Sequence, residues 1–168
     1  MDPWHRCGMK EFPSTLKHIT LWAVLGTVVF LAVQAWQARQ RQSLFSAQGG
    51  VIELRRSADG HFHWPGSVNG VAVEFLVDTG ATRSALPLSL AQAAGLRAEG
   101  SVQSATAGGT VQGWSGRGDL QLQGGVRVQR LALTVLPSLS SPLLGMDVLG
   151  KLHFSQADGV LRLRPPAR

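Results

Sequence analysis

One short stretch in the middle of the chain holds the residues best suited to chemistry. A largely apolar, strand-like run, Val73 to Val77, leads directly into Asp78, and Thr79-Gly80 turns the chain away after it. A carboxylate at the end of a buried strand is costly unless another group pairs with it or uses it. Asp78 is therefore a candidate reactive group, and the alternative is an acid that only caps the Thr-Gly turn.

Two later features accompany this stretch. A glycine-rich hairpin with Gly108 and Gly109 at its tip follows about 30 residues after Asp78. Near the C-terminus, residues 143–147 (LLGMD) indicate a buried strand, a glycine turn and the start of a brief helix. We expect Asp147 to cap that helix or to hydrogen-bond locally, and not to join the chemistry.

These features resemble, in order and spacing, the protomer of a retropepsin-like (clan AA) aspartic protease. The resemblance covers about Val51 to Leu163 and depends on Asp-Thr-Gly-Ala-Thr at residues 78–82 and Leu-Leu-Gly-Met-Asp at residues 143–147. Such a protomer carries a catalytic loop, then a flap, then a segment that crosses behind the catalytic loop. The resemblance implies an aspartic-type endopeptidase, a hydrolase of peptide bonds that uses no metal and no organic cofactor.

The resemblance also implies roles for individual residues. Asp78 would supply the catalytic carboxylate, and Thr79 would lock the loop by hydrogen-bonding across to its symmetry mate. Gly80 would leave room for the substrate backbone to approach closely. The implied residues are Thr79, Gly80, Ala81 and Thr82 for loop support, Ala107, Gly108, Gly109 and Thr110 for the substrate-binding flap, and Leu144 and Gly145 behind the site.

Two positions depart from the viral pattern. Viral enzymes carry an Asp that helps to hold the substrate backbone and an Arg that pairs with it. Thr82 and Met146 stand at these positions, so both members of the ion pair are missing. The chain thereby resembles the cellular, membrane-anchored bacterial type whose active-site loop reads DTGAT.

The chain contains a single Asp-Thr-Gly loop, whereas this chemistry needs two carboxylates. One acts as a base on a water molecule and the other, protonated, polarises the scissile carbonyl. We therefore expect a homodimer in which two copies of Asp78 form the dyad and act on a peptide or protein substrate. The alternative is a catalytically silent module of the same fold that dimerises or binds peptides.

From residue 49 onward the sequence predicts an all-β domain, a retropepsin-like closed β-barrel protomer with one or two short helices. Short strand-like runs alternate with Gly and Asn turns. Asn69-Gly70 predicts a two-residue hairpin before the strand Val71 to Val77. One short helix is expected over Leu88 to Leu96. The predicted protease domain is 49–168.

An N-terminal stretch, residues 19–36, is apolar except for two Thr and one Gln and contains no charge. As a helix it extends about 27 Å, close to the thickness of the hydrocarbon core of a bilayer. We predict an N-terminal cytoplasmic segment (1–18), a transmembrane helix (19–36) and a polar tether (37–48). A buried core helix and a cleavable signal peptide are the alternatives.

The orientation in the membrane is less constrained, because basic residues flank the apolar run on both sides. We expect a single-pass protein of the inner (cell) membrane, with the N-terminus inside and the C-terminal domain periplasmic or extracytoplasmic. Cys7, the only cysteine, excludes an intrachain disulfide and is compatible with an N-terminus in the cytoplasm.

Other function classes find little support in the composition. The 16 Lys and Arg residues are spread along the chain without a basic run that alternates with aromatic residues, which argues against nucleic-acid binding. His61 and His63 lie on one face of an expected strand and could hold a metal, but no third ligand is evident. We therefore expect exposed or packing histidines and no metal site.

Overall fold

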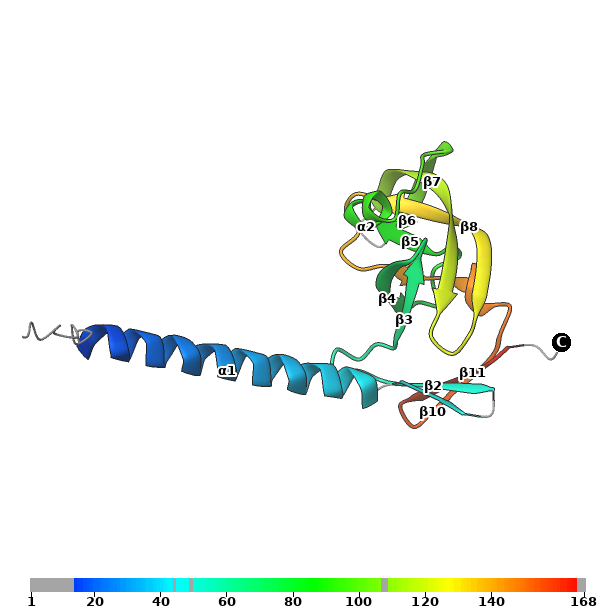
Figure 1. Cartoon of the computed structure of the whole chain (residues 1–168). Helices are drawn as coiled ribbons and strands as arrows, with labels where there is room; N and C mark the ends of the chain where they lie inside the picture. Colours follow the sequence, from blue (N-terminus) through cyan, green and yellow to red (C-terminus); the bar gives the residue numbers. More distant parts are fainter. Residues whose placement is uncertain (1–13, 44, 49, 107–108, 166–168) are drawn as a thin grey trace, which may run out of the picture. The chain divides into compact units, whose positions relative to one another are not determined.

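The computed structural model describes residues 14–43, 45–48, 50–106 and 109–165, and the chain divides into two compact units. The first unit, Met1–Gln42, contains nearly all of helix α1 (Ser14–Ser43; Figure 1). The stretch His18–Trp36 of this helix has a mean hydropathy of 1.9, and none of it is buried. By length and composition, the helix is suited to crossing a membrane, as the sequence predicts for residues 19–36.

The segment predicted as a tether, residues 37–48, contains regular secondary structure. Helix α1 continues through it to Ser43, and β1 (Phe45–Gln48) follows as a strand. β1 pairs antiparallel with β2 (Val51–Arg55), so that Gln48 lies opposite Val51. The tetrapeptide FSAQ has little apolar patterning, and its strand conformation depends on the hydrogen-bonding edge that β2 offers.

The second unit, Ser43–Arg168, is dominated by strands. The helices among its described residues are α2 (Leu88–Ala93) and α3 (Met146–Leu149). This content confirms an all-β domain with two short helices in the part that the structure describes. After β1 and β2, its strands are β3 (His63–Val68), β4 (Val71–Val77), β5 (Ala85–Pro87), β6 (Gly100–Thr106), β7 (Gly109–Leu122), β8 (Arg127–Leu136), β9 (Leu143–Leu144), β10 (His153–Ala157) and β11 (Val160–Arg164).

Within the described residues the strands form a small sheet and a large one. The small sheet has the order β1-β2-β11-β10, and the large sheet has the order β3-β4-β9-β5-β8-β7-β6. β3 also pairs with β7, for example through Val68 and Leu120. This pairing closes six strands, in the order β3-β4-β9-β5-β8-β7, into a ring. β6 pairs with β7 and lies outside the ring. The closed arrangement follows from pairings between segments far apart in the sequence.

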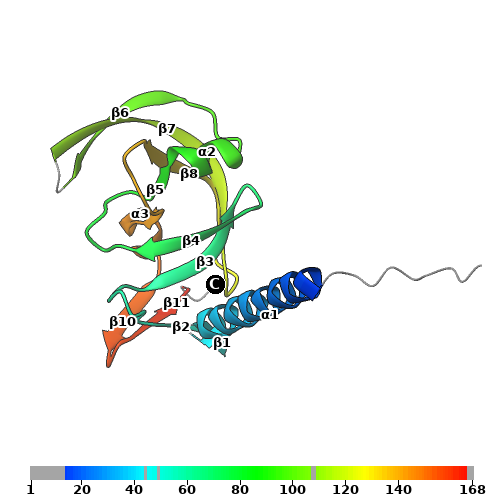
Figure 2. The same cartoon turned by 90° about the vertical axis from the view of Figure 1, so that its left-hand side faces the viewer.

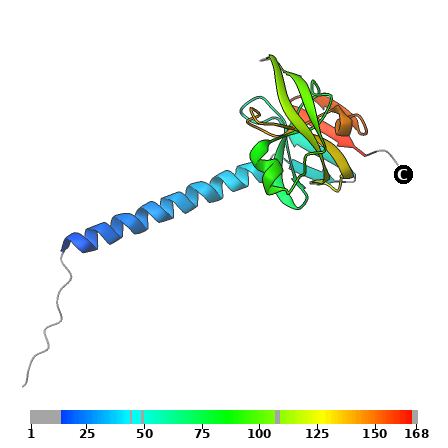
Figure 3. The same ribbon diagram turned by 90° about the horizontal axis from the view of Figure 1, so that it is seen from above.

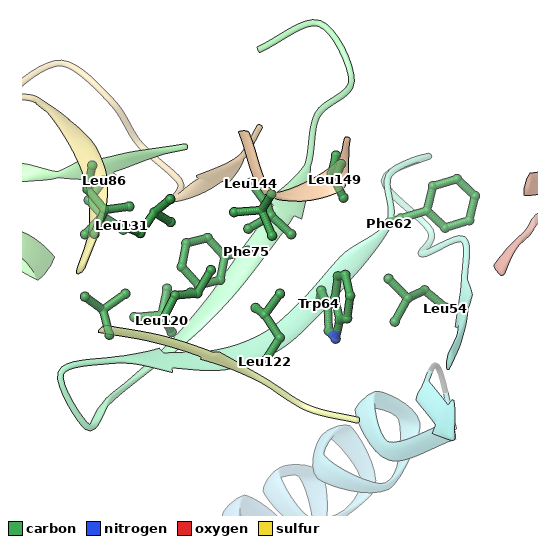
Figure 4. Close-up of a cluster of buried hydrophobic side chains, with 14 of the residues drawn as sticks. Leu54, Phe62, Trp64, Phe75, Leu86, Leu120, Leu122, Leu131, Leu144 and Leu149 are labelled. Atoms are coloured by element: carbon green, nitrogen blue, oxygen red, sulfur yellow. The ribbon is translucent and has the colours of Figure 1, made fainter. Parts of the chain in front are cut away.

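A single cluster of buried side chains is shared by the two sheets (Figure 4). Trp64 of β3 and Phe75 of β4 are paired across the two strands and are fully buried. Each large apolar side chain buried in this way contributes about 1.5–3 kcal/mol relative to an exposed one. The indole Nε1 of Trp64 donates to the backbone oxygen of Gln123 at 2.8 Å, so the one polar atom of this ring is satisfied.

Strand β4 leads from a tight turn to the candidate reactive group. Asn69 and Gly70 have φ angles of 49° and 83°, as a two-residue hairpin requires, and they connect β3 to β4. Along β4, Val73 and Phe75 are buried and Glu74 between them is exposed. One face of the strand therefore lies in the core, and this burial fixes where β4 ends and where the next residue, Asp78, must lie.

The β6–β7 hairpin extends beyond the rest of the domain (Figures 2 and 3). Its two strands pair from Gly100 opposite Ser115 to Thr106 opposite Gly109. In Figure 2 the hairpin reaches toward the same side of the domain as the loop between β4 and β5. The predicted glycine-rich hairpin is thus a projecting one.

Candidate active site

Asp78 lies directly after β4, where a neighbouring strand holds the backbone. β9 runs parallel to the end of β4, with Leu143 opposite Leu76 and Leu144 opposite Val77. The backbone N–H of Asp78 donates to the oxygen of Leu144 at 3.0 Å. Two apolar residues that are distant in the sequence therefore set the position of the carboxylate-bearing residue.

The side chain of Asp78 is partly buried and turns back on its own loop. Its Oδ1 accepts a hydrogen bond of 2.8 Å from the backbone N–H of Gly80. A Cβ at Gly80 would lie 3.1 Å from this oxygen, which is tighter than ordinary contact. The backbone N–H of Ala81 donates to the backbone carbonyl oxygen of Asp78 at 3.3 Å. The turn is thus compact, and Thr79 and Gly80 remain exposed on it.

The loop that follows Asp78 is held from behind by the segment at the start of α3. The backbone N–H of Met146 donates to the oxygen of Ala81 at 2.8 Å. At Gly145 a Cβ would lie 2.6 Å from the carbonyl carbon of Arg83 and 2.9 Å from the oxygen of Ala81. These are backbone atoms, so only a glycine permits this approach. Leu144 and Gly145 therefore lie against the candidate loop, and their role behind an active site stays a prediction.

Asp147 makes the contact that sequence reasoning missed. We expected this acid to cap α3 or to bond locally, but the helix has no side-chain cap, and Asp147 binds Ser84 instead. Both of its oxygens accept from the backbone N–H of Ser84 at 3.0 Å, and Oδ1 also accepts from Ser84 Oγ at 2.7 Å. Ser84 Oγ in turn accepts from the N–H of Gly145 at 3.0 Å.

This Ser84–Asp147 contact connects the far end of the candidate loop to α3. Ser84 is completely buried and Asp147 is partly buried, so the network is shielded from water and worth more than a surface contact. The sequence offered one indication of this contact. Ser84 begins an otherwise apolar run, and a hydroxyl that is buried there needs a hydrogen-bond partner. Nothing in the sequence identified that partner as a residue 63 positions later.

The two positions that depart from the viral ion pair lie on the two segments that this network joins, the candidate loop and α3. Thr82 is exposed on the loop, and Met146 is exposed at the start of α3. Where the viral pattern has a side-chain ion pair, this chain links the two segments through the Met146–Ala81 backbone contact and the Ser84–Asp147 network.

The predicted flap residues are only partly covered by the structure. Gly109 and Thr110 begin β7 and are exposed. Ala107 and Gly108 lie outside the described residues. The predicted flap thus belongs to the projecting β6–β7 hairpin, and its role in binding substrate stays a prediction.

The histidines considered as metal ligands contact an acid. His63 Nε2 lies 2.7 Å from Asp59 Oδ2, and the backbone N–H of His61 donates to Asp59 Oδ1 at 3.0 Å. The pKa of Asp59 is lowered mainly by the hydrogen bond from the His61 backbone and, to a smaller extent, by the hydrogen bond from the His63 side chain. In the described part of the chain, no three His, Cys, Asp or Glu residues come together as a metal site would require.

Comparisons with known proteins agree with this geometry. The chain matches the family model described as "gag-polyprotein putative aspartyl protease" over residues 64–151. A retropepsin-like aspartic protease from Rickettsia conorii is 27% identical in sequence and aligns with a TM-score of 0.56, covering 72% of this chain and 95% of that protein. The EIAV protease, solved in complex with the inhibitor HBY-793, is 20% identical with a TM-score of 0.50, covering 56% and 89% respectively, and supports the fold alone. No curated protein matches the sequence.

The family match extends from β3 to the residues just after α3, more than half of the chain. It therefore includes Asp78, the loop that follows it and the segment that holds this loop from behind. The chain belongs to this aspartyl protease family and is a retropepsin-like aspartic protease.

Proposed function

We propose that this protein is a membrane-anchored aspartic endopeptidase whose active centre combines Asp78 from two copies of the chain. The observation that carries the proposal is the position of Asp78 at the end of β4, in a compact turn that β9 and α3 hold from behind. The roles of Thr79, Gly80, Ala81 and Thr82 in shaping this loop are part of the same proposal.

The need for a second copy follows from the single Asp-Thr-Gly loop, because the proposed chemistry uses two carboxylates. Most other acids among the described residues make contacts away from Asp78. A two-fold symmetric dimer supplies an identical residue at the symmetry axis. The acids with contacts of their own are Glu53, Asp59, Glu99, Asp119 and Asp147.

In the proposed dimer the two carboxylates share one proton, because like charges at close range disfavour ionisation of both. The ionised Asp78 takes a proton from a water molecule, which attacks the carbonyl carbon of the scissile peptide bond. The protonated Asp78 donates a hydrogen bond to the carbonyl oxygen. The Asp78 that took the proton from water then transfers it to the peptide nitrogen, and the C–N bond breaks, so a peptide or protein is hydrolysed without a metal or organic cofactor.

Strand β10 offers a surface for the second copy. Among the described strands of the small sheet, β10 is at an edge, and all five of its residues are exposed. Phe154 on this strand is 41% exposed. An edge strand with an exposed aromatic side chain readily pairs with another chain. In Figure 2, β10 and the loop after β4 lie on the same side of the domain, as a dimer through both would need.

The membrane anchor is proposed for residues 19–36, preceded by a cytoplasmic segment (1–18) and followed by the connection to the protease domain. The large apolar side chains of this stretch are exposed in the structure, which a membrane would cover. Two anchored copies share one membrane, and this raises their effective concentration for pairing. Accessibility of the domain to added protease in intact cells tests the periplasmic or extracytoplasmic location.

The test of catalysis uses the unit Ser43–Arg168, which has its own buried core. We expect pepstatin-sensitive cleavage of a peptide library by the wild type and none by Asp78→Asn, with fold and dimer unchanged. Glu74→Gln is the matched control, because it removes an exposed carboxylate from the same strand. Cleavage by Asp78→Asn would refute the assignment, and an inactive wild type that still dimerises would favour the silent binding module.

The test of the dimer uses Phe154→Glu. A charge on this exposed edge should shift the sedimentation of the unit toward the monomer and lower its specific activity about tenfold or more. Gln129→Glu, which adds the same charge to an exposed side chain of β8, should do neither. A Phe154→Glu variant that stays dimeric and active would place the interface elsewhere.

A further inference from the structure

An open surface pocket of about 380 Å³, called the cavity below, lies beyond the opposite end of β4 from Asp78, and all the charged residues that line it are exposed. Asn69, in the turn that precedes β4, lines it, whereas Asp78 follows the last residue of that strand. Three arginines, Arg97, Arg117 and Arg130, also line the cavity. No residue of the candidate loop after Asp78 lines this cavity, so a ligand bound here would be independent of the proposed proteolysis.

One acid in the cavity is paired with an arginine, the other accepts only from a backbone N–H and keeps its charge, and two of the arginines are uncommitted. Glu99 Oε2 accepts from Arg117 Nε at 3.0 Å. Asp119 Oδ1 accepts from the backbone N–H of Arg130 at 2.8 Å. The guanidinium groups of Arg97 and Arg130 form no hydrogen bond or ion pair within the part of the chain that the structure describes. The cavity therefore presents two sets of uncommitted cationic donors.

The backbone around the cavity is held in an unusual conformation. Of the non-glycine residues that the structure describes, Asn69, Arg130 and Asp158 have positive φ, and the first two line this cavity, both at 49°. For a long side chain such as Arg this conformation is costly and persists only where the surroundings impose it. It accompanies a register shift between β7 and β8 near Gly118 and Leu120. The fold thus places Arg130 at the rim of the cavity against its local preference.

We propose that this cavity binds a phosphate group, held by the guanidinium donors of Arg97 and Arg130. Guanidinium presents parallel N–H donors that match the oxygens of a phosphate, and the hydrogen bonds are strengthened by the charges. Two guanidinium groups offer enough N–H donors for the several oxygens of a phosphate, whereas a carboxylate has only two oxygens; the charge of Asp119 lowers the net positive charge of the lining. The same phosphate chemistry is found in a free phosphate ester and in the headgroup of an anionic phospholipid.

The test titrates inorganic phosphate into the ¹⁵N-labelled full chain in a zwitterionic detergent, at constant ionic strength. We expect saturable changes in the amide signals of residues that line the cavity, such as Gly95 and Gly118. Arg97→Ala should weaken this binding about tenfold or more, because it removes charge-assisted hydrogen bonds. Arg130→Asn is the second variant, since Asn tolerates a positive φ and preserves the turn.

Arg127→Ala is the matched control, because Arg127 is on the same strand as Arg130 but does not line the cavity. It should leave phosphate binding unchanged. The proposal fails if phosphate causes no saturable change, if Arg127→Ala weakens binding as much as Arg97→Ala does, or if acetate binds as tightly as phosphate. None of these outcomes depends on proteolytic activity.

The source of the phosphate is distinguished by a competition. In nanodiscs that contain phosphatidic acid, a headgroup site would raise the apparent dissociation constant for inorganic phosphate relative to phosphatidylcholine nanodiscs. An unchanged dissociation constant would assign the cavity to a soluble phosphate ester. For a headgroup site, Arg97→Ala should reduce the difference between the two kinds of nanodisc. For a soluble ester, it should weaken phosphate binding equally in both.

Discussion

The two ends of β4 are built in opposite ways. At the start of the strand, Asn69 Oδ1 accepts from the Asp119 N–H and Asn69 Nδ2 donates to the oxygen of Ala94, both at 2.8 Å. At the other end, Asp78 Oδ1 accepts from the Gly80 N–H, and Oδ2 has no hydrogen bond to any described residue. At the start of β4, both polar atoms of the Asn69 side chain are hydrogen-bonded within the chain. At its end, one carboxylate oxygen of Asp78 has no such hydrogen bond.

This difference separates a residue that stabilises the fold, Asn69, from the residue that we propose to be reactive, Asp78. The side chain of Asn69 links its own turn to Ala94 and to Asp119, so this residue stabilises the fold. Asp78 is held through its backbone by β9 and through Oδ1 by the N–H of Gly80, and only Oδ2 remains without a hydrogen bond to a described residue. A carboxylate positioned by its surroundings with one oxygen unengaged suits the proposed catalysis. Substitutions at the two ends of β4 and around the candidate loop should therefore differ in their effects on stability and proteolysis.

The largest effect is expected from Gly145→Ala. The new Cβ would lie 2.6 Å from the carbonyl carbon of Arg83, and backbone atoms cannot move aside as a flexible side chain can. We expect a loss of about 1–3 kcal/mol in the free energy of unfolding and a marked loss of proteolysis. Urea denaturation and peptide cleavage by the unit Ser43–Arg168 measure these effects.

Gly100→Ala is the control for that change, since its Cβ would have its nearest neighbour at 3.7 Å, an ordinary contact. It should leave both quantities nearly unchanged. Equal behaviour of the two variants would mean that close approach behind the active-site loop is unimportant.

The next effect concerns Asp147→Ala. It leaves the N–H and Oγ of the buried Ser84 without their acceptor, at a cost of about 1–3 kcal/mol in the free energy of unfolding. Because Ser84 ends the active-site loop, we expect kcat to fall more than KM rises. Asp147→Asn retains an oxygen acceptor and should recover part of both losses.

A double-mutant cycle with Ser84→Ala tests whether these two residues act together. The coupling energy between contacting groups in one network is about 0.5–3 kcal/mol. Strictly additive losses would show that Asp147 acts on the loop by another route.

A smaller effect is expected from Asn69→Ala. It removes two side-chain hydrogen bonds and places Ala at a φ of 49°, so unfolding should become easier by about 1–2 kcal/mol. The kcat for peptide cleavage should stay within about twofold, because this end of β4 takes no part in the chemistry. Asn69→Gly, which relieves the backbone, should lose less stability. A large fall in kcat would overturn the contrast between the two ends.

The smallest effect is expected from Asp59→Asn, and it depends on pH. The hydrogen bonds from the His61 backbone and from His63 lower the pKa of Asp59 below its usual value of about 3.8. A carboxyl with a lowered pKa in the folded state stabilises the protein above that usual value, and loses this contribution as the pH falls through the lowered pKa. Thermal unfolding should therefore show a slightly less stable variant at neutral pH and no difference in strong acid.

Much of the fold could be predicted from local patterns. Asn69-Gly70 predicted a two-residue hairpin, and the alternation from Val71 to Val77 predicted β4 with its bounds. These features depend on interactions between near neighbours in the chain, which are visible in the residue types. β1 was missed because its strand conformation depends on an edge that another segment supplies.

For the candidate site, the residue types alone identified the acid that follows an apolar strand. The folded chain was needed to show that Gly145 approaches the backbone of Arg83, that Ser84 is the partner of Asp147, and that three arginines line one cavity. These contacts could not be predicted because they join segments separated by tens of residues. Their energies depend on distances that the closed ring of strands creates.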